Sequence, residues 1–415
     1  MNDTLGSPEA VGCSSERLAR INPVMQSYVD ERRFAGLSTM LARHGQVIHF
    51  AQFGCQDRES GAPLTADTIF RIYSMTKPIV CAALMTLYEE GRFQLFDPVA
   101  KFLPAFGAVR VLAGATPNEL REVDLVRPIT IRDLMTHTAG LTYHFDEDSP
   151  VCEMYRQAGL LSDASRTLEA TIGELARLPL AYQPGTKWHY SMGIDVAGHL
   201  IEVISGRPLA QFLDERLFKP LGMVDTGFSV PPSKSDRIAT IYGTRDFAAS
   251  TVSDCIAAWQ AGLIGRIDVN MTYPSADVPS FARGGHGLFS TAWDYMRFAQ
   301  MLLNRGELDG VRILAPKIVD LMHMNHLPSA LLPWELGGQP ISGYGFGLGS
   351  RVLLNVAESA LPGSVGEYGW DGAAKTYYWV DPQEDLIGVF MTQYMMGLDS
   401  PDNDFRVLAY QALVD

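Results

Sequence analysis

Apolar residues near the start of the chain follow a helical period first and a strand-like pattern afterwards. The helical pattern predicts an amphipathic helix over Ser15–Glu31, whose apolar positions are Leu18, Ile21, Met25 and Val29. Two β-rich runs follow, at 37–43 and 47–53. The segment His44-Gly45-Gln46 between them is typical of a hairpin turn. The start of the chain is therefore predicted to be a helix followed by a two-stranded hairpin.

The end of the chain shows the same elements in the reverse order. Residues Tyr344–Val352 and Lys375–Val380 are β-rich, and Leu386–Gln393 is expected to pair with the second of these runs across the turn Asp381–Glu384. A final helix is predicted from Pro401 to Val414. Helices and hairpins at both ends predict an α+β fold with an antiparallel sheet, in which the two termini lie together.

The middle of the chain has a helical pattern divided by loops. The capping box Thr130–Asp133 predicts the start of a short helix. Capping and helix-breaking residues predict three further helices, at Thr167–Leu178, Ser191–Ile204 and Leu209–Leu217. No strand pair is expected between Pro104 and Phe228. We therefore predict a first part of an α/β subdomain at 1–103, an inserted mostly helical subdomain at 104–230, and the second part of the α/β subdomain at 231–415.

The candidate chemistry lies at the start of an apolar helix at 79–87. Pro78 is tolerated in the first turn of a helix but not in its interior, so the helix begins about one turn before it. Ser74 then lies at the N-terminus, where unpaired backbone N–H groups and the positive end of the helix dipole face its hydroxyl. Lys77 lies three residues further on, on the same face of the turn. A serine beside a lysine that an apolar setting keeps neutral is a nucleophile beside a base.

The S-x-x-K spacing alone is weak evidence, because a chain of this composition contains it by chance about one time in three. Of the seven lysines, only Lys77 has a serine three residues before it. The competing interpretation is a surface N-cap serine followed by a lysine that extends to solvent. The apolar helix behind the pair favours the catalytic interpretation.

Two later segments carry groups suited to the same site. Tyr190 lies in a loop before a predicted helix, and next to Lys77 its pKa is expected to fall, which would let its hydroxyl relay protons. The segment 366–374 is rich in glycine, so a ligand can approach its backbone closely. The N–H of Ala373 is expected to join that of Ser74 in an oxyanion hole. The alternatives are a half-buried core tyrosine and an ordinary glycine-rich turn between strands.

Composition and charge narrow the class of protein. The chain has 415 residues, of which 47% are hydrophobic and 19% charged, as expected for a globular protein with two subdomains. Its formal net charge of -14 disfavours nucleic acid and anionic membranes as partners, because both bind clustered Lys and Arg. The sequence shows no leader pattern and no stretch of membrane-helix length, so a cytoplasmic location is predicted. The five cysteines are scattered and without C-x-x-C spacing, so neither a disulfide framework nor a zinc site is predicted. His323 and His326 are three apart but not part of an H-E-x-x-H motif, so no metal is predicted there, and no cofactor is expected.

Three motifs together resemble those of serine β-lactamases and penicillin-binding proteins. They are Ser74-Met75-Thr76-Lys77, Tyr190-Ser191-Met192 and Trp370-Asp371-Gly372, in the order and at roughly the separations found in that superfamily. Within it the chain looks most like the class C β-lactamase-related esterases called family VIII carboxylesterases, and the resemblance covers nearly the whole chain. It implies a β-lactamase-like fold of the class C type. It also implies that Ser74 is the nucleophile, Lys77 the general base, Tyr190 the proton relay and Ala373 an oxyanion donor.

Two departures from the lactamase pattern bear on the substrate. Met192 stands where such lactamases carry the asparagine of Y-x-N, and Trp370 stands where they carry the lysine of K-T-G. That lysine meets a substrate carboxylate, and losing such a charge-assisted contact costs about 1.5 to 3 kcal/mol. A competing register would read Lys375-Thr376-Tyr377 as the K-T-G motif. It is rejected because Tyr377 would stand where only glycine lets a substrate reach the backbone.

The sequence therefore predicts a serine carboxylesterase that hydrolyses short-chain neutral esters through an acyl-enzyme, with weak β-lactam hydrolysis as a side activity. The residues expected to contact or crowd the substrate are Trp334, Tyr368, Trp370, Asp371, Gly372 and Tyr377. No G-x-S-x-G occurs, so an α/β-hydrolase elbow is excluded, and a Ser-Lys-Tyr site does not need His189 as a triad base. Other functions stay open: a β-lactamase or D-amino-acid peptidase, an acyltransferase, and a non-catalytic binding module. The protein is either a monomer or a homo-oligomer.

Overall fold

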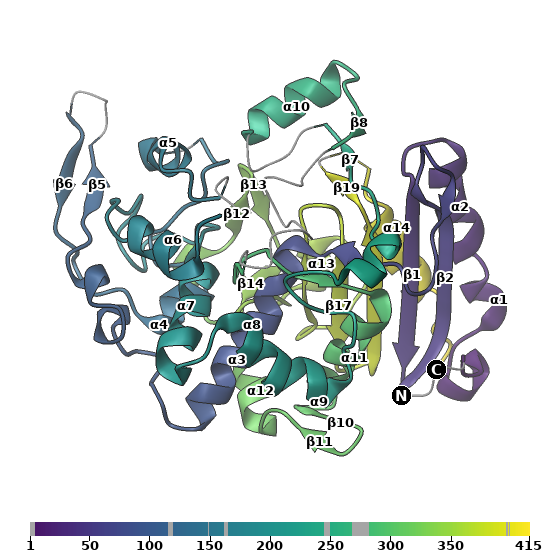
Figure 1. Ribbon diagram of the computed structural model, residues 1–415. Coiled ribbons are helices and arrows are strands. Elements are labelled where there is room, and N and C mark those ends of the chain that lie inside the picture. Colours follow the sequence, from purple (N-terminus) through teal and green to yellow (C-terminus); the bar gives the residue numbers. More distant parts are fainter. Residues whose placement is uncertain are drawn as a thin grey trace.

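A large antiparallel sheet forms the centre of the molecule (Figure 1). The computed structural model describes residues 5–114, 119–147, 149–161, 165–244, 250–267, 282–395, 397 and 399–415. Within these residues the sheet has eight strands in the order β14-β15-β16-β17-β18-β1-β2-β3. Their bounds are β1 Gly36–Arg43, β2 Gln46–Asp57, β3 Ala62–Pro63, β14 Tyr344–Phe346, β15 Arg351–Leu353, β16 Tyr368–Asp371, β17 Tyr377–Asp381 and β18 Leu386–Thr392.

The two predicted hairpins meet at the centre of this sheet. Strand β1 pairs with β2 on one side and with β18 on the other, in a register that sets Met40 opposite Val389. Strand β18 in turn pairs with β17. All residues of β1, β17 and β18 are buried, because helices cover both faces of the sheet. The predicted α+β class, with an antiparallel sheet, is confirmed.

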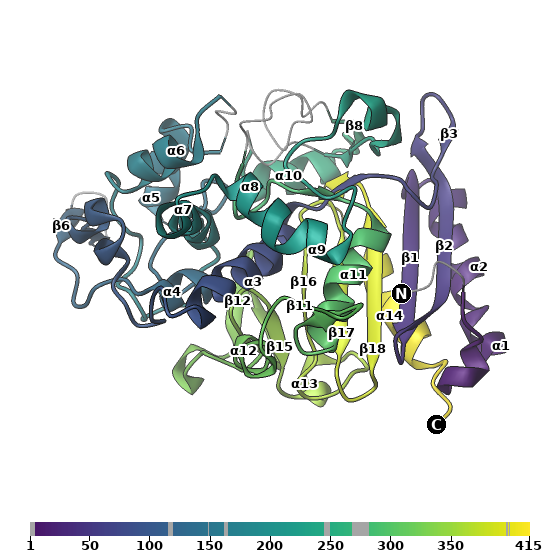
Figure 2. The same ribbon diagram turned by 60° about the horizontal axis from the view of Figure 1, so that its bottom comes forward.

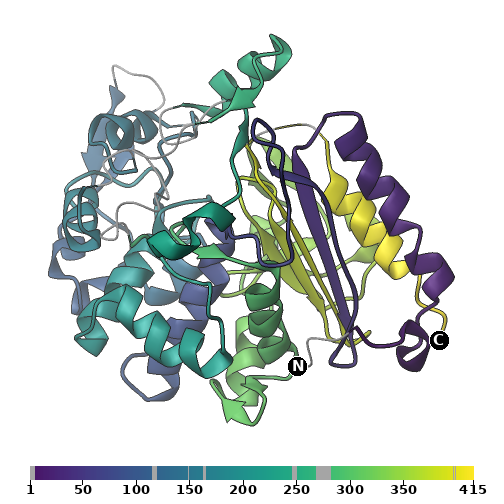
Figure 3. The same cartoon turned by 45° about the vertical axis from the view of Figure 1, so that its right-hand side comes forward.

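Helices from the two ends of the chain lie side by side on one face (Figure 3). They are α1 Ser15–Leu18, α2 Ile21–Asp30 and α14 Pro401–Tyr410. A bridge between Cys13 and Leu413 joins the two ends directly, which confirms the prediction that the termini meet. The predicted single helix over 15–31 is wrong in one respect, since it breaks before Ile21. The second helix restarts two residues before Pro23, so the proline lies in its first turn, where its missing N–H costs no hydrogen bond.

The opposite face of the sheet is covered by α11 (Ala292–Leu303), beside which runs α3 (Thr76–Glu89) (Figure 2). Helix α3 also packs on α7 (Gly193–Ser205) of the helical region, and one buried apolar cluster continues from α3 through both neighbours. The other helices are α4 Ile131–Met135, α5 Pro150–Gln157, α6 Leu168–Leu175, α8 Leu209–Leu213, α9 Lys219–Leu221, α10 Val252–Gln260, α12 Pro316–Met322 and α13 Val356–Ser359. The division of the chain at 103 and 230 stays a prediction.

The helical region contains a strand pair that was not predicted. Strand β5 (Val111–Ala113) pairs with β6 (Arg121–Val123), and Val111 also bridges to Leu180. Strands of three residues are too short to show alternation in the sequence, which is why the pattern missed them. The remaining short strands are β4 Phe70–Arg71, β7 Tyr242–Gly243, β8 Gly265–Arg266, β9 Phe289–Ser290, β10 Glu307–Leu308, β11 Val311–Arg312, β12 Trp334–Leu336, β13 Gln339–Ile341 and β19 Tyr394–Met395. Over the described ranges, no helix combines the length and apolar character needed to span a lipid bilayer.

Candidate active site

Ser74 lies in a tight turn between a strand and the buried helix α3. A 3-10 turn at Tyr73–Met75 leads directly into α3, and Pro78 is the third residue of that helix, as the sequence predicts. Every residue of α3 from 76 to 87 is buried. Tyr73 has a φ of 44°, in the left-handed region that a bulky residue seldom occupies. Strain of this kind is typical of functional sites, and here it is found directly before the candidate nucleophile.

Lys77 points back from α3 to the Ser74 hydroxyl. Its Nζ donates to Ser74 Oγ at 3.2 Å and to the backbone carbonyl of Gly285 at 2.7 Å. The side chain is fully buried, and this burial lowers the pKa of Lys77 to about 7, while the carboxylates of Asp195 and Asp371 act in the opposite direction. At neutral pH about half of the Lys77 amines are therefore unprotonated. An amine in that state, within hydrogen-bond reach of a hydroxyl, can accept its proton.

Tyr190 supplies a phenol to the same site from the loop before α7. Its ring lies 4.5 Å from Lys77 Nζ and packs against the rings of His137 at 4.8 Å and Trp370 at 5.7 Å, measured between centroids. The prediction that its pKa falls is wrong. Burial among these rings raises the pKa of Tyr190, and interactions with Ser74 and Trp370 offset this only in part. Tyr190 is therefore a neutral phenol at physiological pH, able to donate a proton but not to act as a standing phenolate base.

The glycine-rich segment after β16 lies against the backbone that precedes Ser74. A Cβ on Gly372 would be 2.4 Å from the Ile72 carbonyl oxygen and 2.2 Å from Thr376 Oγ1, so only glycine permits this approach. The approach sets Ala373 in the lining of the same cavity as Ser74. Lys375 is turned away and donates to the Asp399 carbonyl at 2.7 Å, so it does not take the place of a K-T-G lysine facing this cavity.

The cavity over Ser74 has a volume of about 240 Å³ and a mostly apolar wall. Its lining residues are Ser74, Tyr143, Phe145, Asp146, Tyr190, Val252, His286, Leu336, Gly337, Trp370, Asp371 and Ala373. None of these described lining residues is a lysine or an arginine. The cavity therefore offers no cation on its wall to a carboxylate group.

Three of the aromatic residues predicted to crowd the substrate are not among the residues that line this cavity. Tyr368 stacks on His323, with 3.5 Å between ring centroids, and Trp334 packs on Trp188 at 4.3 Å. The hydroxyl of Tyr377 accepts hydrogen bonds from Arg351 and Arg406. Gly372 and Tyr377 line a neighbouring cavity instead. Of the predicted contacts, only Trp370 and Asp371 border the space above Ser74.

Tyr143 and Phe145 line the cavity over Ser74, although the sequence did not predict either of them there. Their rings stack with 4.8 Å between centroids, and Tyr143 also lies 5.2 Å from the Tyr190 ring. Their spacing of two in the loop after Gly140 is only a weak sequence signal, since two residues so spaced face one side only where the backbone is extended. The wall of the cavity is therefore aromatic, but from a different loop than the one expected.

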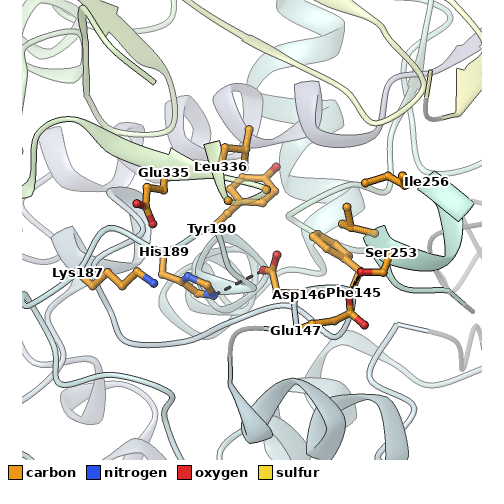
Figure 4. Close-up of a pocket in the computed structure, with 13 residues that line it drawn as sticks. Phe145, Asp146, Glu147, Lys187, His189, Tyr190, Ser253, Ile256, Glu335 and Leu336 are labelled. Carbon is orange, nitrogen blue, oxygen red and sulfur yellow. Dashed lines mark hydrogen bonds and ion pairs between the residues drawn. The ribbon is translucent and has the colours of Figure 1, made fainter. Parts of the chain in front are cut away.

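A second cavity of about 350 Å³ adjoins the first. The residues common to both linings are Phe145, Asp146, Tyr190, Val252, Leu336 and Gly337. Figure 4 shows its more polar wall, with Glu335 and Lys187 on one side and Asp146 and Glu147 on the other. His189 lines this second cavity, where its Nε2 lies 2.8 Å from Thr142 Oγ1 and 3.6 Å from Asp146 Oδ2. It is absent from the wall over Ser74, so its position does not favour a triad base.

Comparisons with known proteins agree with this fold. The sequence profile of the Beta-lactamase family matches residues 21–413. Protein Rv1367c of Mycobacterium tuberculosis is 37% identical over 369 residues, which are 88% of this chain and 87% of the relative. Esterase EstB of Burkholderia gladioli is 30% identical over 381 residues, 90% of each chain. The solved structure of EstCE1, a hydrolase with promiscuous acyltransferase activity, matches at a TM-score of 0.77 and 29% identity, over 96% of this chain and 99% of that one.

The fold and these similarities define a serine hydrolase with a β-lactamase-like architecture. The profile match spans nearly the whole chain, and the match to EstB extends over nine-tenths of it. The chain belongs to the Beta-lactamase family.

Proposed function

We propose that this protein is a carboxylesterase that hydrolyses neutral esters of short acyl chains through an acyl-enzyme on Ser74. The observation that carries the proposal is the contact of 3.2 Å between Lys77 Nζ and Ser74 Oγ beside an apolar cavity without a cation on its wall. A nucleophile and a base in contact support covalent catalysis. The apolar wall favours an uncharged acyl group. The similarity to Esterase EstB is consistent with this reaction.

The proposed reaction begins when neutral Lys77 takes the proton of Ser74 Oγ as that oxygen attacks the ester carbonyl carbon. The carbonyl oxygen becomes an oxyanion, which the N–H groups of Ser74 and Ala373 stabilise. The bond from carbon to the alcohol oxygen then breaks, and the leaving oxygen receives the proton from the Lys77 ammonium through the hydroxyl of Tyr190. Water then attacks the acyl-enzyme and gives a proton to Lys77. The bond from the carbonyl carbon to Ser74 Oγ then breaks, the Lys77 ammonium returns its proton to Ser74 Oγ, and the carboxylic acid leaves.

The wall of the cavity also bears on β-lactam substrates. Penicillins carry a carboxylate, and no described lining residue is a cation that would pair with it. Asp371, at the end of β16, lines the same cavity and is an acidic residue, so it does not pair with a carboxylate either. We therefore expect β-lactam hydrolysis to be slower than ester hydrolysis, which makes a β-lactamase or D-amino-acid peptidase the weaker candidate.

An acyltransferase is the second candidate, and the adjoining cavity favours it. That cavity has space for an acceptor alcohol next to an acyl group held over Ser74, and the two spaces share the Tyr190 ring. EstCE1, which is similar in structure, is a hydrolase with promiscuous acyltransferase activity. Adding a small alcohol during ester turnover distinguishes the two, because transfer diverts the acyl group from acid to a new ester.

The direct test measures p-nitrophenyl butyrate hydrolysis by the wild type, Ser74→Ala and the matched control Ser233→Ala. Ser233 is an exposed serine in a surface turn, so its substitution tests for unspecific effects. We expect Ser74→Ala to be inactive and Ser233→Ala to equal the wild type. Equal activity in Ser74→Ala and the wild type would end the proposal. Faster turnover of nitrocefin than of the ester would favour a β-lactamase instead.

A further inference from the structure

A carboxylate that belongs to none of the three motifs lies close behind the Ser74–Lys77 pair. Asp195 is in the first turn of α7 and has no exposed surface. Its Oδ1 accepts the backbone N–H of Gly285 at 3.0 Å. The carbonyl oxygen of the same glycine accepts a hydrogen bond from Lys77 Nζ, at 2.7 Å between the two atoms. One residue, Gly285, therefore joins a buried carboxylate to the candidate base.

The contact between Asp195 and Gly285 is close enough to fix the glycine in place. A Cβ on Gly285 would lie 2.4 Å from Asp195 Oδ2 and 2.7 Å from the Tyr143 hydroxyl, and a Cβ on Gly284 would lie 2.4 Å from the Ile194 carbonyl oxygen. The double glycine is thus packed onto the start of α7. A displacement of Asp195 would move the Gly285 carbonyl, and with it one of the two hydrogen-bond partners of Lys77.

We propose that Asp195 is a positioning residue, which holds the Gly285 carbonyl against Lys77 and places a buried carboxylate behind the amine. This inference rests on the proposed role of Lys77 as the base for Ser74. Asp195 touches no substrate in this scheme and acts only through Lys77.

Other groups also face Lys77, and their effects on its pKa have to be distinguished from the effect of Asp195. From α3 itself comes the Cys81 thiol, from β16 the Asp371 carboxylate, and from the surrounding loops the rings of Tyr143 and Tyr190. Asp195 exerts the largest electrostatic effect among the charged groups, and it raises the pKa of Lys77 against the effect of burial. The buried rings of His137 and His286 also feel the charge of Lys77. Burial lowers the pKa of both histidines well below the usual range, so neither changes charge near neutral pH.

Burial of Asp195 opposes the ionisation of its carboxyl, whereas neighbouring positive and N–H groups stabilise the ionised form. Burial raises the pKa of the Asp195 carboxyl above its ordinary value, and Lys77, the Gly285 N–H and Arg283 offset this rise only in part. His286 Nδ1 lies 3.8 Å from Asp195 Oδ1. These groups are the same in every variant proposed below, so a difference between variants reports on position 195 alone.

The test compares the pH dependence of kcat/KM for Asp195→Asn and the wild type. The amide oxygen of asparagine can still accept the Gly285 N–H, but the negative charge is gone. Without that charge the Lys77 ammonium is less stable, so the pKa of Lys77 falls. The acid limb of the profile, which is the rise of kcat/KM with pH as Lys77 loses its proton, therefore moves to lower pH by about one unit. Relative to its own plateau, activity at pH 6 should rise about fivefold, because the neutral fraction of Lys77 grows from about one tenth to about one half.

Asp294→Asn is the matched control. Asp294 is also buried in the first turn of a helix, α11, and it accepts backbone and side-chain hydrogen bonds from Asp225 and Thr226 at 2.7 and 2.9 Å. Its loss should cost stability without moving the acid limb. Asp195→Glu serves as a second variant that keeps the charge but misplaces the carboxylate. We expect it to retain the wild-type limb and to lose about tenfold or more in kcat, because the Gly285 carbonyl shifts.

The outcomes separate this inference from the proposed function. An unmoved limb in Asp195→Asn, or full kcat in Asp195→Glu, would overturn the role of Asp195 while leaving Ser74→Ala inactive. If Asp195→Asn does not fold, the kcat of Asp195→Glu decides. Full activity in Lys77→Met would instead overturn the proposed function itself.

Discussion

Replacing Lys77 by methionine should make the protein more stable below about pH 8 while it removes the activity. Methionine has nearly the same length and fits an apolar niche, so it leaves little cavity. Burial lowers the pKa of Lys77 from 10.5 to about 7. Between these two values the unfolded chain binds a proton that the folded chain does not bind, so the stability of the wild type rises with pH. Below about pH 7 both states are protonated, and the folded wild type carries the full cost of the buried ammonium.

The size of this cost follows from the shift of the pKa. A change from 10.5 to about 7 corresponds to about 5 kcal/mol, since each pH unit is about 1.4 kcal/mol. Methionine removes that cost but leaves the Gly285 carbonyl without its donor, which costs about 1 to 3 kcal/mol. Lys77→Met should therefore be more stable than the wild type by about 2 to 4 kcal/mol at pH 7 or below. Above about pH 10.5 it should be less stable, by the cost of the missing hydrogen bond.

The assay is urea unfolding of both proteins between pH 6 and pH 10, with ester hydrolysis measured on the same samples. Every other titrating group is common to both proteins, so the difference in free energy of unfolding reports on Lys77. The advantage of Lys77→Met should shrink steadily from pH 7 upward. If Lys77→Met is less stable than the wild type at pH 6, or if the difference in free energy of unfolding does not change with pH, burial does not destabilise the Lys77 ammonium and the prediction is wrong.

Three further predictions concern the same site. For the wild type, kcat/KM with p-nitrophenyl butyrate should rise about tenfold from pH 6 to pH 8, because the pKa of Lys77 is about 7; a rate that is flat over this range would exclude Lys77 as the base. Gly372→Ala should lose about a hundredfold or more in kcat, since its Cβ would press on the Ile72 carbonyl and displace the backbone before Ser74; unchanged steady-state kinetics would show that this approach is not needed. Tyr190→Phe should lower kcat by about 100-fold or more and leave the acid limb in place, because a neutral phenol relays the proton but does not set the pH dependence; loss of the limb in a pH profile would assign the base to Tyr190.

The parts of the fold that depend on local rules could be predicted from the sequence. Pro78 fixes where α3 begins, and that alone places Ser74 at a helix terminus with Lys77 on the same face. The capping box at Thr130 and Asp133 is present as expected, and so are the two hairpins at the ends of the chain. These features need only backbone conformation and hydrogen bonds between near neighbours in sequence.

The features that were missed or wrongly predicted depend on contacts between distant segments. Tyr190 was expected to have a lowered pKa because of one charged neighbour, yet the rings packed around it from other segments desolvate the phenol and reverse the direction. Tyr377 belongs to a β-rich run that the sequence does show, but the sequence does not show that Arg351 and Arg406 donate hydrogen bonds to its hydroxyl. In the sequence, Asp195 is only an aspartate in the first turn of a helix. Its hydrogen bond with the Gly285 N–H depends on the fold, which brings the two distant segments together.

The most direct test of the proposed catalytic centre is to find which residue a serine-directed reagent modifies. A fluorophosphonate should label the wild type at one site, and peptide mapping by mass spectrometry should place the adduct on Ser74, whose hydroxyl contacts Lys77. Labelling should disappear in Ser74→Ala and persist in Ser233→Ala. An adduct on any other residue, or none under conditions in which the ester is hydrolysed, would contradict the assignment.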